Sequence, residues 1–127
     1  NTTAEQKEKV VTSTPFFKLS LAQWSLHKTF NDQGVDPFKF AEMSKQMGFE
    51  GLEYVNHLYV KQIEELGFDT VIDSLKTLSK KNGMQNVLIM VDNEGDLADP
   101  DEDVRDAAVE NHKKWIDAAA KLGAHAI

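Results

Sequence analysis

Residues 48–57 read GFEGLEYVNH, a glycine at the end of a helical pattern followed by a short apolar run that ends in polar groups. Gly48 can adopt the left-handed backbone conformation that closes a helix, so a helix is predicted to end there. Residues 51–55, GLEYV, are too few for a helix and suit a pleated surface, which predicts a strand. The stretch therefore predicts a helix, a tight turn and a buried strand, in that order.

Glu53 lies in the middle of this predicted strand. Because side chains alternate along a strand, Glu53 points away from the face that carries Leu52. If Leu52 faces covering helices, the carboxylate of Glu53 points into the middle of a sheet or barrel, where it is costly unless something there uses it. A strand-end salt bridge and a role in a site are both open for this residue.

The chain before this stretch predicts one more strand and the helix that ends at Gly48. Residues 17–24, FKLSLAQW, alternate between two faces and predict the first strand, whose far end carries Trp24 and is followed by His27. Asp36 precedes a proline and is predicted to cap the helix, since proline loses nothing at the first helical position. The predicted buried stripe of that helix is Phe40, Ala41, Ser44 and Met47.

The chain after the stretch repeats the alternation of helix and strand. A short helix is predicted over residues 60–66, and a longer one is capped by Asp69 or Thr70 and ends at Asn82 and Gly83. The following run, NVLIMV at residues 86–91, is continuously apolar and of strand length. Such a run is expected where a parallel strand is covered on both faces.

A long helix and the start of a further strand complete the pattern. Asp99 and Pro100 repeat the cap-then-proline device and predict the start of a helix that ends at Gly123. Residues 124–127 are predicted to begin a strand. The acidic run 92–103 lacks the ligand spacing of a calcium-binding loop and predicts a solvated loop with a helix cap. The predicted buried residues of the helix are Val104, Ala108, Trp115, Ala118, Ala119 and Leu122.

The order of these elements predicts an α/β fold with a parallel sheet, because strands joined by helical crossovers run in the same direction. Neither a phosphate-binding P-loop nor a GxGxxG fingerprint follows any predicted strand, which argues against a nucleotide-binding open sheet. Periodicity alone leaves two architectures open, an open doubly wound sheet and part of a (β/α)₈ barrel.

Composition sets the outer limits. The sequence has 127 residues, of which 41% are hydrophobic, enough for one domain with a core. A net charge of −7 disfavours nucleic acid as a partner, and the absence of cysteine excludes thiolate chemistry. No apolar run approaches the roughly 20 residues of a membrane span.

The amino-terminal residues are expected to form a separate region. Residues 1–15 are polar and aperiodic and are predicted to be a flexible tail, which leaves 16–127 as the folded part. The sequence starts at Asn1 without an initiator methionine, as a mature protein does after signal-peptide removal or as a trimmed sequence does. Of these two, export to the periplasm or beyond is favoured over a cytoplasmic location.

Three short motifs add a resemblance to these patterns. WSLH at residues 24–27, FAEM at 40–43 and MGFEGLE at 47–53 resemble the opening of the xylose isomerase-like TIM barrel superfamily, in particular its sugar phosphate isomerase/epimerase group. LSKKNG at 78–83 and LGA at 122–124 are similar as well. The resemblance implies that residues 16–127 are the first three to four βα units of a (β/α)₈ TIM barrel, its N-terminal half, and that the barrel is incomplete.

The resemblance also implies an activity, a metal-dependent sugar or sugar phosphate isomerase or epimerase. Such enzymes move a proton next to a carbonyl through an enediolate that a divalent metal stabilises, here Mn, Mg, Co or Zn. The family's metal ligands and catalytic acids lie mostly on later strands, so no catalytic or metal residue is assigned. Strand-end residues of this segment are expected to form the substrate-side wall of the pocket: Trp24, His27, Glu53, Asn56, His57, Asp92 and Glu94.

Two other functions stay open. One is a phosphodiester hydrolase like the apurinic-site endonucleases of the same superfamily, ranked lower because Asp92 follows strand three and the chain is acidic. The other is a non-catalytic carbohydrate-binding module. The expected partners are a small sugar or sugar phosphate and, since a few βα units leave an open parallel edge, either the missing half of the barrel or a second copy of the chain. His112, on a helix surface, and His125, near the bottom of a strand, are expected to have no role in the site.

Overall fold

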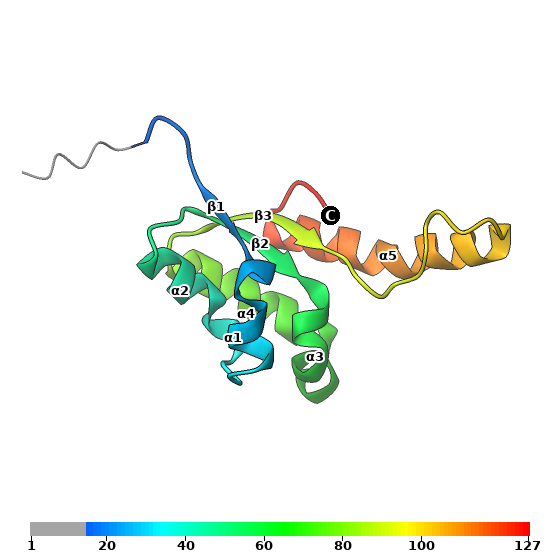
Figure 1. Cartoon of the computed structure of the whole chain (residues 1–127), viewed down its shortest axis with the longest axis horizontal. Coiled ribbons are helices and arrows are strands. Elements are labelled where there is room, and N and C mark those ends of the chain that lie inside the picture. The colour runs from blue at the N-terminus through cyan, green and yellow to red at the C-terminus, as the bar shows by residue number, and fades with distance from the viewer. Residues whose placement is uncertain (1–14) are drawn as a thin grey trace, which may run out of the picture.

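A computed structural model describes residues 15–127 of the chain (Figure 1), so nearly all of the predicted tail over 1–15 lies outside the described residues. Strands, α-helices and short 3₁₀ helices alternate along this part. In chain order they are β1 (Ser20–Ala22), η1 (Gln23–Leu26), α1 (His27–Asn31), η2 (Pro37–Lys39), α2 (Phe40–Gln46), β2 (Gly51–Val55), η3 (Asn56–Tyr59), α3 (Val60–Leu66), α4 (Phe68–Lys81), β3 (Gln85–Met90) and α5 (Glu102–Leu122).

The three strands form one parallel sheet in the order β1-β2-β3. The helices gather on one side of this sheet (Figure 1). The predicted α/β fold with a parallel sheet is therefore confirmed. No helix in the described part of the chain is long and apolar enough to cross a lipid bilayer.

The core lies between the helices and one face of the sheet. Leu52 is fully buried and Tyr54 is 2% exposed, whereas Glu53 between them is only half-buried on the opposite face. The alternation predicted around Glu53 is thus confirmed. The principal core residues contributed by helices are Phe40, Val71, Ile72, Leu75, Trp115 and Leu122.

Strand β3 differs from its prediction in one respect. It spans Gln85–Met90 and has the predicted length, but it is not covered on both faces. Ile89 is buried against the helices, while Leu88 is half-buried and Met90 is 38% exposed on the other face. The apolar run therefore marks a strand whose second face is only partly covered in the described part of the chain.

The first strand is shorter than predicted. Only Ser20–Ala22 pairs with β2, and Phe17 before it is 53% exposed. The strand ends early because Gln23 turns inward and is fully buried: its amide oxygen accepts from Val55 N and its amide nitrogen donates to the Tyr59 hydroxyl. Residues 23–24, predicted as strand, are therefore part of the 3₁₀ helix η1.

The helix boundaries around α2 and α3 are mostly as predicted. Asp36 accepts a hydrogen bond from Phe38 N at 2.9 Å, and Gly48 has a φ of +89°, so both predicted caps are confirmed. Helix α3 covers the predicted residues Val60–Leu66. Met47 was predicted to be buried and is 51% exposed, because it follows the last turn of α2 and faces away from the core.

Two predicted helix starts are wrong. Helix α4 begins at Phe68, where Gly67 with a φ of +88° turns the chain straight out of α3, so neither Asp69 nor Thr70 caps it. Helix α5 begins at Glu102 and is capped by Asp101, whose carboxylate accepts from the next two backbone N–H groups in reach, at residues 103 and 104. The predicted cap residue Asp99 instead accepts from Asp101 N within the preceding loop.

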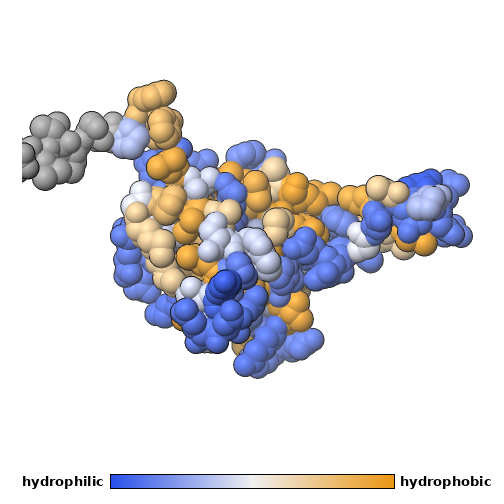
Figure 2. All heavy atoms as spheres, in the orientation of Figure 1, coloured by the Kyte–Doolittle hydropathy of each residue, from blue (hydrophilic) through white to orange (hydrophobic). Residues whose placement is uncertain are grey.

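The two ends of α5 also differ from the prediction in detail. Its first turns project beyond the sheet and end in mainly hydrophilic residues (Figures 1 and 2), so Val104, predicted to be buried, is 43% exposed. The other predicted buried residues of this helix are buried. Gly123 ends the helix with a φ of +75°. The predicted strand over 124–127 is reduced to one bridge between Leu88 and Ala126.

Candidate functional site

The carboxyl ends of the three strands bring together side chains that lie far apart in the sequence. Trp24 and His27 follow β1, His57 follows β2, and Asp92 follows β3. The rings of Trp24 and His27 are stacked at 4.6 Å between centroids, and the rings of His57 and Trp24 make a T-shaped contact at 5.1 Å between centroids. Four of the seven predicted site residues thus form one cluster at this edge of the sheet.

His57 and Asp92 form a close polar pair in this cluster. Nδ1 of His57 lies 3.3 Å from Oδ2 of Asp92, close enough for an ion pair but without the geometry of a hydrogen bond. This Nδ1 atom is buried and has no other partner, while the side chain of Asp92 is 44% exposed. The carboxylate is therefore placed to orient the imidazole ring while it remains open to solvent.

Asn56 has a different position from the one expected of a substrate contact. Its side chain is 4% exposed and makes both of its hydrogen bonds to the backbone of Asp92, donating to the carbonyl at 2.9 Å and accepting from the N–H at 2.8 Å. The amide thus ties the end of β2 to the end of β3. Its contribution to the cluster is to place Asp92.

Glu53 lies on the sheet face opposite the helical core. Its carboxylate accepts a hydrogen bond from the hydroxyl of Ser20 on the neighbouring strand. Together with Trp24 it lines a cavity of about 570 Å³ on this face, whose other walls include Val55, Leu88 and Met90. In the described part of the chain, Glu53 is therefore the carboxylate that reaches this largely apolar cavity from the middle of the sheet.

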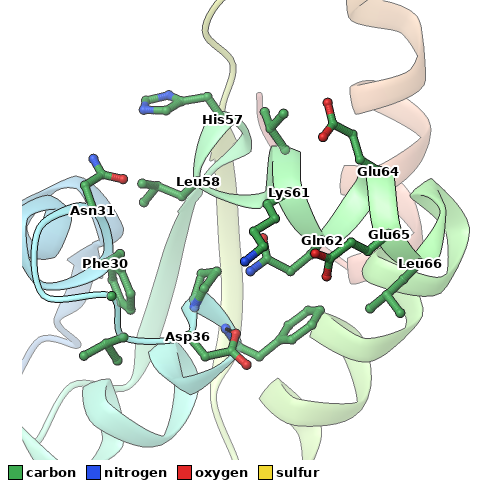
Figure 3. Close-up of a pocket in the computed structure, with 15 residues that line it drawn as sticks. Phe30, Asn31, Asp36, His57, Leu58, Lys61, Gln62, Glu64, Glu65 and Leu66 are labelled. Atoms are coloured by element: carbon green, nitrogen blue, oxygen red, sulfur yellow. Dashed lines mark hydrogen bonds between the residues drawn. The ribbon is translucent and has the colours of Figure 1, made fainter.

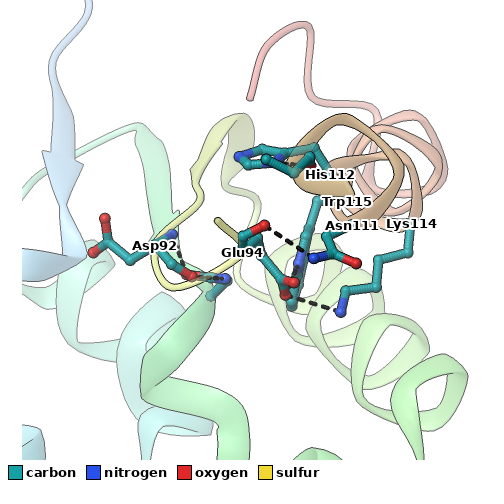
Figure 4. A network of polar contacts seen from close by, with 8 residues as sticks. Asp92, Glu94, Asn111, His112, Lys114 and Trp115 are labelled. Atoms are coloured by element: carbon teal, nitrogen blue, oxygen red, sulfur yellow. Dashed lines mark hydrogen bonds and ion pairs between the residues drawn. The ribbon is translucent and has the colours of Figure 1, made fainter. Parts of the chain in front are cut away.

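Glu94 turns away from the cluster toward α5 (Figure 4). Its Oε1 atom accepts from Nε1 of Trp115 at 2.8 Å and from Nζ of Lys114 at 2.9 Å. Burial by itself would raise the pKa of Glu94, but the hydrogen bonds from Lys114 and Trp115 outweigh it and lower the pKa below its usual value. The structure thus places Glu94 beside the cluster without joining it to Trp24 or His57.

Two residues near the site were given no site role from the sequence. Gln23, next to Trp24, holds β1 and β2 together through the hydrogen bonds described above, and alternation along a strand gives no signal for such a buried amide. His112 of α5 lines the 570 Å³ cavity and bonds through Nδ1 to the carbonyl of Ala108. Its place on the cavity wall depends on how α5 crosses the sheet. His125, expected near the bottom of a strand, is exposed beside the single bridge at Ala126.

A second cavity, of about 710 Å³, lies between the loop after α1 and helix α3 (Figure 3). His57 lies at its rim, Lys61 and Gln62 line it from α3, and Asp36 lines it from the facing loop. The Oε1 atom of Gln62 is buried without a hydrogen-bond partner. His57 therefore belongs to the strand-end cluster and also borders this second cavity.

A metal ion does not fit the residues that the structure describes. Among residues 15–127, no group of three or more His, Asp or Glu side chains lies close enough together to hold one. His57 and Asp92 offer two donors that face each other at 3.3 Å. A metal centre would need ligands from outside the described residues.

Comparison with known protein families shows which family the chain belongs to. A family model described as xylose isomerase-like TIM barrel matches residues 41–127, more than half of the chain. The chain belongs to the xylose isomerase-like TIM barrel family. No curated protein sequence matches the chain significantly.

Membership of the xylose isomerase-like TIM barrel family confirms the resemblance expressed by MGFEGLE and the later motifs. It also identifies the three-stranded parallel sheet as part of a TIM barrel, whose sites lie at the carboxyl ends of the strands. The family contains isomerases and epimerases as well as apurinic endonuclease-like members. Trp24 and His27 precede the matched residues, so their place in the site rests on the geometry alone.

Proposed function

We propose that the protein is a metal-dependent sugar or sugar phosphate isomerase or epimerase, and that the described strand ends form the substrate-side wall of its pocket. The observation that carries the proposal is the pairing of His57 with Asp92 beside the exposed ring of Trp24. An oriented imidazole can move protons near neutral pH, and an aromatic ring can take the apolar face of a sugar. Both lie where this family of barrels assembles its sites.

The individual side chains fit distinct tasks in such a reaction. His57, with Nδ1 turned to Asp92, keeps its Nε2 atom for a hydroxyl or carbonyl oxygen of the substrate. Trp24 is 41% exposed and covered by His27 on one face, so the cavity that it lines with Glu53 is where a sugar ring would stack. The carboxylate of Glu53 can accept hydrogen bonds from sugar hydroxyls there.

A divalent cation remains part of the proposal as the expected cofactor. When bound, it would stabilise the negative charge that develops on the substrate oxygens as the proton is removed. The described residues do not provide its ligand set, so their tasks are to bind and orient the sugar and to hold a proton at His57.

Proton exchange with solvent tests the proposed reaction directly. The intact protein is incubated in deuterated water with a divalent metal and a panel of aldoses, ketoses and their phosphates, and deuterium next to the carbonyl is followed by NMR. Incorporation into at least one sugar is expected, with most of it lost in His27→Ala and Glu53→Ala. Glu110→Gln, which removes only an exposed ion pair on α5, is the matched control. Binding of sugar without any exchange would favour the non-catalytic carbohydrate-binding module instead.

Phosphodiester hydrolysis is the alternative that the family also contains, and the described cluster supports it less. Glu53, Asp92 and Glu94 surround this edge with carboxylates, which repel a phosphate backbone. Lys114, the positively charged side chain beside Glu94, already forms an ion pair with Glu94 and so is not free to bind a phosphate. Cleavage of abasic-site DNA by the intact protein at physiological salt would reverse this ranking.

A further inference from the structure

The loop that follows β3 is held in place at two residues, Asp92 and Glu94, by side chains from different elements. On the side of the sheet, Asn56 holds the backbone of Asp92 with two hydrogen bonds. On the side of the helices, Glu94 is held by Trp115 and Lys114 of α5. Only one residue, Asn93, separates the two fixed points, and it has a φ of +63°. The direction of the Asp92 side chain thus depends on both attachments.

Backbone contacts tighten the attachment to α5. The side-chain amide of Asn111 donates to the carbonyl of Glu94 at 3.1 Å. Gly95 packs so closely on α5 that a Cβ atom there would lie 2.9 Å from the Cβ of Ala108. Figure 4 shows the side chains of Glu94, Lys114 and Trp115 meeting between the loop and the helix. The loop therefore lies directly on α5, with the carboxylate of Glu94 as its main polar attachment.

The position of Asp92 decides the tautomer of His57. The buried Nδ1 atom of His57 has no hydrogen-bond partner and faces Oδ2 of Asp92 at 3.3 Å. An unprotonated nitrogen would place its partial negative charge 3.3 Å from a carboxylate oxygen, which is repulsive, whereas the partial positive charge of an N–H there is attracted. This contact therefore favours the neutral ring with its proton on Nδ1, which leaves Nε2 as the nitrogen that can accept a proton.

We propose that Glu94 is a positioning residue: anchored on Trp115 and Lys114, it holds the loop so that Asp92 keeps His57 in the Nδ1–H tautomer. Glu94 acts at a distance from the substrate, through Asp92 and then His57. Its place in catalysis rests on the proposed function, whereas its effect on the tautomer does not. This assignment gives Glu94 a different task from the substrate contact that its sequence position suggested.

Nitrogen-15 NMR of His57 in the intact protein tests the proposal, at a pH at which the imidazole is neutral. The His57 signals are assigned by their loss in His57→Gln. The wild type is expected to show mainly the Nδ1–H tautomer. Glu94→Ala is expected to shift the ring toward the Nε2–H form and to lower turnover about tenfold, as loss of an orienting partner does. Glu110→Ala, which removes an exposed ion pair with Lys113, is expected to change neither.

A second variant keeps the test decisive if Glu94→Ala folds poorly. Lys114 is half-exposed, so Lys114→Met should fold and should shift the tautomer in the same direction by a smaller amount. An unchanged tautomer in both variants, even with a lowered melting temperature, would mean that Glu94 only stabilises the fold and would overturn the proposal. Because this measurement needs no substrate, its failure is distinguishable from a failure to exchange deuterium into sugars.

Discussion

Two buried asparagines at opposite ends of the sheet serve different purposes. Asn86, 7% exposed near the amino end of β3, accepts from the Tyr54 hydroxyl and donates to Ser79 and to the carbonyl of Leu122. Asn56, 4% exposed at the carboxyl end of β2, bonds only to the backbone of Asp92. The first closes a network inside the core, and the second fixes a side chain at an open edge.

This contrast separates stability from function along the strands. At the amino end, polar groups are buried and paired, as for the Tyr54 hydroxyl, whose burial raises its pKa well above the usual range. At the carboxyl end, Trp24 and Asp92 remain about two-fifths exposed and the Nδ1 atom of His57 lacks a hydrogen bond. Substitutions at the carboxyl end should therefore lower turnover with little change in stability, and substitutions at the amino end should lower stability with little change in turnover.

The largest expected effect is on turnover at the carboxyl end. His57→Ala should lower the rate of sugar isomerisation by about 10²- to 10⁴-fold, the usual contribution of a positioned proton-transfer group. Its side chain is partly exposed and lies at the edge of the sheet, so the melting temperature should change little. Steady-state kinetics and thermal unfolding of the same sample measure both. Wild-type turnover in His57→Ala would contradict the site assignment.

The opposite signature is expected at the amino end. Asn86→Ala removes the partner of the Tyr54 hydroxyl and of the Leu122 carbonyl and should lower the free energy of unfolding by about 3 kcal/mol, the cost of leaving such groups unpaired. Turnover per folded molecule should be retained. Denaturant unfolding with active-site titration measures the two quantities. A large loss of turnover without a loss of stability would break the comparison.

A smaller loss of stability is expected from Gly51 at the start of β2. A Cβ atom there would lie 2.9 Å from Ser20 Cβ and from Val87 Cγ2 on the two neighbouring strands. Gly51→Ala should therefore destabilise the sheet by about 1 to 3 kcal/mol, as overpacking does. Gly48→Ala is a useful comparison, because its Cβ meets open space and only the φ of +89° is strained, at a cost of about 1 kcal/mol. Chemical denaturation of both variants should rank Gly51→Ala below Gly48→Ala in stability.

The smallest expected effect is on the pH dependence of stability. The pKa of Glu94 is lowered in the folded protein, so its contribution is present above the unfolded-state pKa and is lost as the pH falls through the folded-state pKa. Glu94→Gln lacks this ionisation and should lose less stability than the wild type on acidification below about pH 4.5. Urea unfolding at several acidic pH values measures the difference. Parallel curves for the two proteins would contradict the pairing with Lys114 and Trp115.

Predictions from the sequence succeeded where one residue decides a local conformation. Gly48, Gly83 and Gly123 all have positive φ angles and end helices, and Asp36 caps a helix as expected. They failed where two similar signals compete. Asp99 before a proline seemed the better cap, yet Asp101 is the residue whose carboxylate reaches the first free N–H groups of α5. Local patterns do not show which of two nearby aspartates begins the helix.

Burial was predicted well for positions inside elements and poorly near their ends. Leu52 and Trp115 are buried as expected, because each lies on a helix-facing or sheet-facing stripe. Met47 and Val104 fit the same periodic patterns, but Met47 follows the last turn of α2 and Val104 lies in the first turn of α5, beyond the part that packs on the sheet. Periodicity gives the direction of a side chain but not how far the neighbouring element extends.

The sequence by itself determined the α/β class, the central strand and the set of polar residues at strand ends, because these follow from periodicity and from glycine and aspartate chemistry within a few residues. Only the tertiary structure decided how that set divides. His57 pairs with Asp92, the side-chain amide of Asn56 bonds to the backbone of Asp92, and Glu94 turns to α5. These pairings join residues more than 20 or 30 positions apart, such as Glu94 with Trp115 and Asn56 with Asp92, and depend on strand register and helix crossing that no local pattern encodes.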